Sequence, residues 1–230
     1  MPARIAIVGD YVATKETHQA IDAELTAAGV DFDWLPTDAV TDAAEALAGY
    51  AGIVITPGEY RDVDGALRAI EYARRRVVPQ VAMCNGFQHV VLEFARNVLG
   101  LTEAAHAEAD PDAELLAVTP LACSLVGLRQ RVRLEPQSQV GAIYGVAEVT
   151  EPFYCSYGVN PALEPELEAA GLHVSGRDAE GSARVLELSD HPFFVATLYV
   201  FNARAGHTPP HPLTTSFLEA SERAAALLRA

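Results

Sequence analysis

Short apolar runs alternate with amphipathic stretches through the N-terminal half of the chain. Arg4–Val8 and Gly52–Ile55 are strongly apolar runs of strand length. Between them, residues 16–28 carry apolar side chains at helical spacing and end at Gly29, a residue type that commonly ends helices. Strands that are apolar on both faces, separated by helices of this length, predict a parallel sheet that helices cover on both sides.

The same patterns predict the remaining elements. In the N-terminal half we expect strands at residues 32–35 and 77–83, and helices at 41–47 (with Thr41 as its N-cap), 62–76 and 86–99. Beyond Leu101 the pattern becomes rich in strands, at residues 115–118, 130–134, 147–154, 185–188 and 194–201, with helices at 162–170 and 215–228. No repeat or linker divides the chain, so we predict one α/β domain over residues 1–230, with a mostly parallel, doubly wound sheet.

In such sheets ligands bind at the carboxyl ends of the strands, which here are followed by residues 9–14, 56–62 and 83–88. The third of these loops contains Cys84, within a small-x-Cys-x-Gly pattern between a strand and a helix. That pattern is typical of a nucleophile elbow, a strained turn that exposes the side chain at its apex. A sulfur at a helix N-terminus is also favoured as the thiolate, which is the reactive form. The alternative is a buried structural cysteine.

Composition excludes several classes of function. The 31 acidic residues against 16 basic ones give a net charge of −15, which argues against binding to nucleic acid. No apolar run reaches the ~20 residues that a membrane-spanning helix needs. Because the N-terminus lacks a signal-peptide layout and three cysteines are too few for a disulfide framework, we expect a cytoplasmic protein. A small-molecule substrate is expected, with neither cofactor nor metal, and a homodimer is compatible with these features.

Residues 77–101 (VVPQVAMCNGFQHVVLEFARNVLGL) resemble the nucleophile strand, turn and following helix of the glutaminase domain of CTP synthases, which are class I glutamine amidotransferases. Matching segments continue along essentially the whole chain, at residues 5–9, 52–55, 57–58, 143–145, 170–172, 186–188, 190–195 and 211–213. The resemblance implies the flavodoxin-like fold of that family, with Cys84 as the nucleophile. The synthetase domain that precedes this domain in CTP synthases is expected to be absent.

The chain departs from the family pattern where the catalytic base should be. A His-Pro-Glu motif after the last sheet strand supplies the base and its orienting carboxylate in that family. Counting from His191 places the three positions at Val200, Phe201 and Asn202, so the triad is degenerate. The nearest following histidine is His207. Losing a triad base costs on the order of 10⁴–10⁶ in rate.

Two further departures concern the substrate. The position of the family's carboxylate-binding arginine falls on Tyr154, beside Cys155, and we expect both to contact the substrate. Gln88 and Glu108 match other substrate-contacting residues of the family, and Glu108 would suit an amino group.

The family's oxyanion loop, Gly-Gly-Phe-Gly, is here Gly58-Glu59-Tyr60-Arg61. The backbone N–H groups of Gly58 and Asn85 are the expected oxyanion donors, and Tyr60 is expected to contact the substrate.

Three functions remain open. The first is a cysteine-dependent hydrolase or acyl-transfer enzyme for a small amide or related carbonyl compound, without standard glutaminase activity. A replacement acid or base would then be Glu59, Asp10 or His18, and one of these or Cys155 should lie close to the Cys84 sulfur. The second is a non-catalytic binding or regulatory protein that keeps the fold. The third is a glutaminase subunit that serves a separate synthetase.

Overall fold

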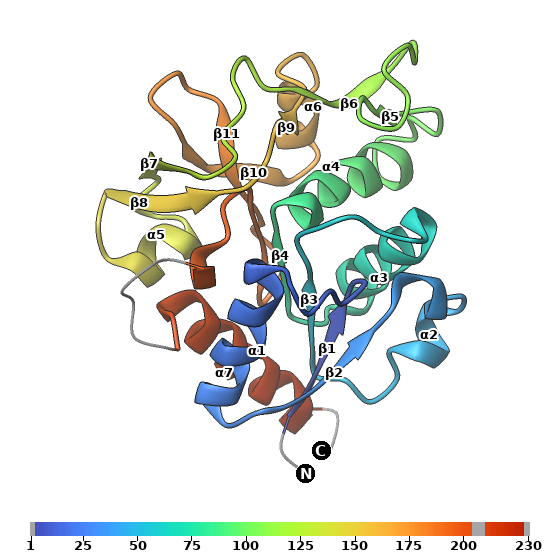
Figure 1. Cartoon of the computed structure of the whole chain (residues 1–230), viewed down its shortest axis with the longest axis vertical. Helices are drawn as coiled ribbons and strands as arrows, with labels where there is room; N and C mark the ends of the chain where they lie inside the picture. Colours follow the sequence, from blue (N-terminus) through green and yellow to red (C-terminus); the bar gives the residue numbers. More distant parts are fainter. Residues whose placement is uncertain (1–2, 204–209, 228–230) are drawn as a thin grey trace.

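A nine-stranded sheet runs through the molecule, in the order β2-β1-β3-β4-β12-β11-β10-β7-β8 (Figure 1). The computed structural model describes residues 3–203 and 210–227. Five neighbouring strands pair in parallel, and the apolar side chains of all but the edge strand β2 are buried as the sequence predicts. They are β2 (Asp31–Leu35), β1 (Arg4–Val8), β3 (Gly52–Ile55), β4 (Gln80–Met83) and β12 (Phe194–Thr197).

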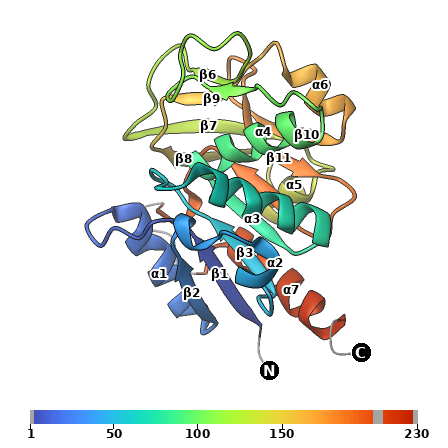
Figure 2. The same ribbon diagram turned by 90° about the vertical axis from the view of Figure 1, so that its right-hand side faces the viewer.

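Four antiparallel strands extend the sheet beyond β12. They are β11 (Ala183–Leu188), β10 (Leu172–Arg177), β7 (Leu128–Leu134) and β8 (Glu148–Phe153). A separate three-stranded sheet is formed by β5 (Ala105–His106), β6 (Leu116–Pro120) and β9 (Tyr157–Val159). Residues of β6 and β9 contact α4 (Asn85–Asn97), so this small sheet lies against that helix (Figure 2).

Helices cover both faces of the parallel strands (Figure 1). On one face α3 (Val63–Arg76) packs along α4, and on the other α7 (Pro212–Leu227) contacts α1 (Glu16–Ala28) and β3. Shorter helices are α2 (Ala43–Ala46), α5 (Gln139–Tyr144) and α6 (Glu164–Ala169), with 3₁₀ turns η1 (Thr37–Ala39) and η2 (Phe201–Ala203). The doubly wound α/β fold is thus confirmed.

Several boundaries differ from the sequence-based prediction. Asp42, not Thr41, caps α2, because its carboxylate accepts hydrogen bonds from Ala44 N and Glu45 N. The strand predicted at 77–83 begins only at Gln80, since Val77 takes a left-handed conformation (φ 58°) that ends α3. The strand predicted at 194–201 ends at Thr197. Strands β5, β9 and β10 and helix α5 were not predicted.

None of the helices within residues 3–203 and 210–227 combines the length and apolar character needed to cross a bilayer.

Candidate active site at the end of strand β4

Cys84 occupies the predicted strained turn between β4 and α4. Its backbone has φ 53° and ψ −108°, a conformation that non-glycine residues rarely adopt and that costs on the order of 1–3 kcal/mol. The hydrogen bond from Cys84 N to Thr197 O (2.9 Å) holds the turn against β12. A Cβ atom at Gly86 would lie 2.7 Å from the Ile55 carbonyl oxygen, so the close packing of the turn on β3 requires glycine there. The local geometry is that of a nucleophile elbow.

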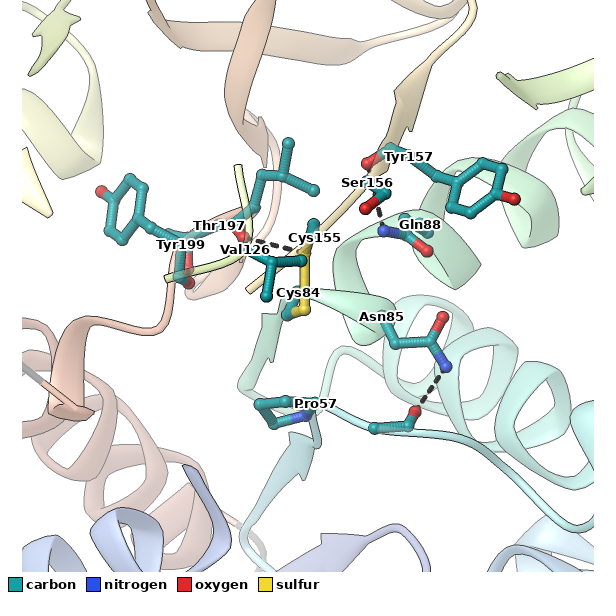
Figure 3. Close-up of a disulfide and its surroundings, with 12 residues drawn as sticks. Pro57, Cys84, Asn85, Gln88, Val126, Cys155, Ser156, Tyr157, Thr197 and Tyr199 are labelled. Atoms are coloured by element: carbon teal, nitrogen blue, oxygen red, sulfur yellow. Dashed lines mark hydrogen bonds between the residues drawn. A yellow bond between two sulfur atoms is a disulfide. The ribbon is translucent and has the colours of Figure 1, made fainter. Parts of the chain in front are cut away.

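The Cys84 sulfur is joined to Cys155 in a disulfide (Figure 3). The two Cα atoms are 6.1 Å apart, and the residues are separated by 71 positions in the sequence. Cys155 lies between β8 and β9, and both cysteines are buried, with 6% and 3% of their surface exposed. Cys155 is therefore the one of the four expected neighbours that contacts Cys84. The spacing of the cysteines did not predict this bond.

A cavity of about 1160 Å³ opens beside the two cysteines. One wall is a stripe along α4, formed by Asn85, Gln88, His89, Leu92 and Arg96. The loop after β3 contributes Gly58, Glu59 and Tyr60, and the chain before β9 contributes Tyr154, Cys155, Ser156 and Tyr157. Residues at and around β5 close the far side, including His106 and Glu108. The predicted loops 56–62 and 83–88 thus reach the cavity, whereas loop 9–14 does not.

Two histidines in this cavity were not anticipated from the sequence. Glu108 N donates to Nδ1 of His106 (3.1 Å), so His106 Nε2 carries the proton and donates to Oε1 of Gln88 (2.8 Å). The Gln88 amide also donates to Tyr157 O (3.1 Å). Gln88, predicted to contact the substrate, is therefore fixed between His106 and β9.

His89 offers an unoccupied basic nitrogen to the cavity. Its Nδ1 lies 2.9 Å from Asn85 O, which only an N–H can satisfy, so Nε2 is unprotonated in the neutral ring. Among the described residues no hydrogen bond reaches Nε2. Burial lowers the pKa of His89 to about 4, which keeps the ring neutral at physiological pH. Its position four residues after Asn85, on the same face of the helix, was a sequence signal that could have identified it.

His18 holds the backbone of the loop after β3, which contains Gly58, the predicted oxyanion donor. Val12 N donates to Nδ1 of His18 (3.0 Å), so Nε2 carries a proton and donates to Pro57 O (2.9 Å). Because C=O and N–H point in opposite directions across a trans peptide, the N–H of Gly58 points away from His18. Asn85 Nδ2 also donates to Gly58 O (2.6 Å) (Figure 3). No hydrogen bond among the described residues uses the backbone N–H of Gly58 or of Asn85.

His18 and Asp10 do not line the cavity, so their positions give no support to the predicted acid–base role. His18 is committed to the loop backbone, and its burial lowers its pKa. The Asp10 carboxylate accepts hydrogen bonds from the Thr37 hydroxyl (2.6 Å) and from Arg61 N (2.8 Å). It therefore ties the end of β1 to two neighbouring loops. Glu59 does line the cavity and is exposed at its rim.

The charges around the cavity are mostly negative. Tyr154 and Tyr60 contribute phenol rings, and the Tyr60 hydroxyl is already used in a hydrogen bond to Thr56 O (2.6 Å). The only basic lining residues in the described part of the chain are Lys15 and Arg96. Acidic lining residues are Glu59, Asp64, Glu103, Glu108 and Asp110. Lys15 lies beside Gly58, a proximity that the sequence did not indicate.

The positions predicted to have lost the family's base and carboxylate, Val200 and Asn202, are buried in the protein interior. Val200 has no exposed surface, its backbone N–H donates to Pro152 O (3.0 Å), and Asn202 is also buried. Neither residue lines the cavity. His207 lies outside the described residues. No group of three His, Cys, Asp or Glu side chains within residues 3–203 and 210–227 is arranged to hold a metal ion.

Comparisons with known proteins agree with this geometry. The family model for glutamine amidotransferase class-I matches residues 13–197. CTP synthase of Acidothermus cellulolyticus is 35% identical over 244 residues, which covers 94% of this chain and 44% of that protein. CTP synthase of Methanopyrus kandleri is 35% identical over 232 residues and covers 90% of this chain and 43% of that protein.

A solved structure, the Trypanosoma brucei CTPS glutaminase domain with bound acivicin, superposes with a TM-score of 0.86 at 25% identity. The match covers 96% of this chain and 94% of that one. The chain spans less than half the length of the curated relatives that it matches.

Proposed function

The chain belongs to the class I glutamine amidotransferases, and we propose that it is a cysteine-dependent enzyme that cleaves or transfers the acyl group of a small amide or related carbonyl compound, not a standard glutaminase. One observation carries this proposal. Cys84 retains the strained elbow at the wall of a large cavity, while the positions of the usual base, Val200 and Asn202, are buried away from that cavity.

The first chemical step requires Cys84 as a free thiol. At the N-terminus of the 13-residue helix α4, the helix dipole favours its thiolate. Attack on the carbonyl carbon would form a tetrahedral intermediate, whose oxyanion could accept hydrogen bonds from the N–H groups of Gly58 and Asn85. Collapse would break the C–N bond and expel the amine, which takes up a proton from water in the cavity, and leave a thioester on Cys84. His18 supports this step as a positioning residue, through Pro57.

The second step needs a base that activates water, and His89 is the best-placed group. It lines the same cavity as Cys84 and lies five residues after it in the chain, on α4, so a water in that cavity could contact both residues. Its neutral Nε2 can take the proton of the water as the water attacks the thioester. The products are a carboxylate and the regenerated thiol of Cys84. Glu59, at the cavity rim, remains a second candidate for proton transfer.

The lining charges favour a neutral or cationic substrate. Five carboxylates against two basic side chains would repel an anion, and Glu108 could bind an amino group. Tyr154 offers no charge for a substrate carboxylate, and losing such a charge-assisted hydrogen bond is worth roughly 1.5–3 kcal/mol. Gln88 is already hydrogen-bonded on both sides of its amide. Together these features disfavour glutamine.

A binding protein without catalysis is the second candidate, and the Cys84–Cys155 bond favours it, because a nucleophile held in a disulfide cannot attack a carbonyl. The curated relatives leave a third candidate, a glutaminase subunit for a separate synthetase, which the loss of the usual base and carboxylate clamp disfavours.

The test measures ammonia release by the fully reduced protein from glutamine and from a panel of small neutral and cationic primary amides. Cys84→Ser is the variant and Cys123→Ser, at an exposed cysteine, is the matched control. We expect turnover of a neutral or cationic amide that Cys84→Ser abolishes and Cys123→Ser preserves. Turnover that survives Cys84→Ser would refute the proposed nucleophile. Turnover of glutamine at several molecules per second would favour the third candidate, and no turnover of any amide would favour the second.

A further inference from the structure

We propose that Cys84 and Cys155 are a reversible dithiol–disulfide couple, in which a hydroperoxide oxidises Cys84 and Cys155 then closes the disulfide. This inference concerns the two sulfurs alone and does not require the proposed amide chemistry. It assigns to Cys155 the role of a resolving thiol, and to the cavity the role of an entry path for a small oxidant.

Both cysteines are held by one dipeptide at the end of β12. Cys84 N donates to Thr197 O (2.9 Å), and the Cys155 sulfur lies 3.4 Å from Leu198 O (Figure 3). Only a thiol can donate to that carbonyl, so the reduced form of Cys155 is already provided with a hydrogen-bond acceptor. Consecutive residues, the last of β12 and the one that follows it, thus fix the relative position of the two cysteines.

The backbone around Cys155 is fixed independently. Its carbonyl oxygen accepts a hydrogen bond from Leu125 N (3.0 Å), and Ser156 O accepts one from Leu121 N (2.9 Å). The Cα–Cα distance of 6.1 Å lies within the usual range for disulfides, about 4.4–6.8 Å. The pair can therefore close and open with little movement of the backbone.

The two thiols differ in the way that an oxidation sequence requires. Cys84 lies at a helix N-terminus that favours the thiolate, which is the form that attacks a peroxide. In the reduced form, the Cys155 thiol can donate to Leu198 O, which lies 3.4 Å from its sulfur. Both line the cavity, so a small peroxide can reach Cys84 directly. Cys123, in contrast, is exposed and has no cysteine partner.

The chemistry balances with two external reactants. The Cys84 thiolate attacks the outer oxygen of the hydroperoxide, the O–O bond breaks, and an alcohol or water leaves after taking up a proton. The Cys155 thiol then displaces hydroxide from the sulfenic acid of Cys84, which forms the disulfide and one water. A dithiol supplies two electrons and two protons to restore both thiols, and is itself oxidised to its disulfide. While the disulfide persists, Cys84 is protected from further oxidation.

The experiment uses the full chain with Cys123→Ser, so that the exposed thiol cannot form bonds between molecules. After reduction, the protein is treated with a slight excess of hydrogen peroxide and analysed by mass spectrometry. We expect the loss of two hydrogen atoms, a linked pair of peptides containing residues 84 and 155, and full reversal by dithiothreitol. Two free thiols after the treatment would overturn the proposal, and so would direct conversion of Cys84 to sulfinic acid.

Two additional variants assign the roles. Cys155→Ser can still donate to Leu198 O, and in this variant the sulfenic acid of Cys84 should accumulate and be trapped by dimedone. With Cys84→Ser, dimedone labelling of Cys155 should be at least about tenfold slower. Equal labelling of the two variants, with each shown to be folded by circular dichroism, would overturn the assignment. If the reversible Cys84–Cys155 disulfide forms but the reduced protein hydrolyses no amide, only the proposed function is refuted.

Discussion

Strands β4 and β12 are parallel neighbours, paired from Phe194↔Gln80 to Thr197↔Met83, yet the chain beyond them differs completely. After β4 the residues Cys84, Asn85 and Gln88 line the cavity. After β12, residues 198–201 are fully buried apolar or aromatic side chains. The two strands therefore pair regularly up to their ends, but reactive and polar side chains that line the cavity follow only β4.

This difference shows that the chain after β12 serves the core, where the sequence-based prediction places the lost base. The end of β12 contributes backbone carbonyls that hold both cysteines, and its side chains contribute to the core. We infer that the site now depends on α4, which continues from the elbow and carries His89. The following predictions test that shift from β12 to α4.

The largest effect is expected for His89→Gln, which removes the candidate base on helix α4. Loss of a general base typically costs 10²–10⁴-fold, so kcat for the amide substrate should fall by about that factor. Alkylation of reduced Cys84 by iodoacetamide should be unchanged. His173→Gln, outside the cavity, is the control. A wild-type kcat in His89→Gln would exclude His89 as the base and favour Glu59.

The second prediction concerns stability at acidic pH. Burial lowers the pKa of both His89 and His106 to about 4. Histidines in the unfolded chain have pKa values of about 6.5, so between about pH 6.5 and pH 4 the unfolded chain binds more protons than the folded protein. The free energy of unfolding must therefore decrease as pH falls through this range. At about pH 4.5, each histidine should contribute a loss of roughly 2–3 kcal/mol.

Urea unfolding of wild type and His89→Gln at about pH 7 and about pH 4.5 measures this contribution. The variant should lose less stability between the two pH values, by about 2–3 kcal/mol. An identical pH dependence of the two proteins would show that His89 is protonated normally in the folded state.

A smaller loss is expected for His18→Gln, which disturbs the loop after β3 without removing a residue that lines the cavity. A displaced Gly58 N–H should lower kcat by about 10–100-fold, less than the usual cost of removing an oxyanion donor outright, and leave KM nearly unchanged. Gln19→Ala, at the neighbouring exposed residue, is the control. A loss confined to thermal stability would mean that His18 only supports the fold.

The smallest effect is expected from introducing the family's histidine and glutamate after β12. The double variant Val200→His, Asn202→Glu should remain nearly inactive on glutamine, because Tyr154 still provides no partner for the carboxylate. Burying an imidazole at Val200, which has no exposed surface, should also cost roughly 1–3 kcal/mol of stability. Glutamine turnover that rises more than about 100-fold would show that the base alone was missing.

The sequence predicted the parallel half of the sheet well, because strands such as β1 and β3 are apolar on both faces and end at clear turn signals. The elbow was predictable for a similar reason, since Cys84 and Gly86 occupy a short, local pattern. Strand β10 and helix α5 were missed because their patterns are weaker. Val77 was misassigned because a β-branched residue in a left-handed cap contradicts its local preference.

The site could be only partly predicted, because most of its contacts join distant segments. Cys155 meets Cys84 where an isolated bridge between Phe153 and Tyr199 joins the end of β8 to the chain after β12, which no spacing in the sequence reveals. His106 reaches Gln88 only because the small sheet stands over α4. Asp10 ends β1 as expected, but its carboxylate is directed to Thr37 and Arg61. Sequence alone cannot distinguish that structural use from a catalytic one.

The separation of 71 residues between Cys84 and Cys155 has a further consequence. A covalent link over that span removes many conformations from the unfolded chain, which by loop entropy stabilises the folded protein by up to about 4 kcal/mol. Oxidation would then have two effects. It removes the reactive thiol of Cys84, and it raises the resistance of the folded protein to thermal unfolding and to proteolysis. Reduction of the bond would reverse both effects.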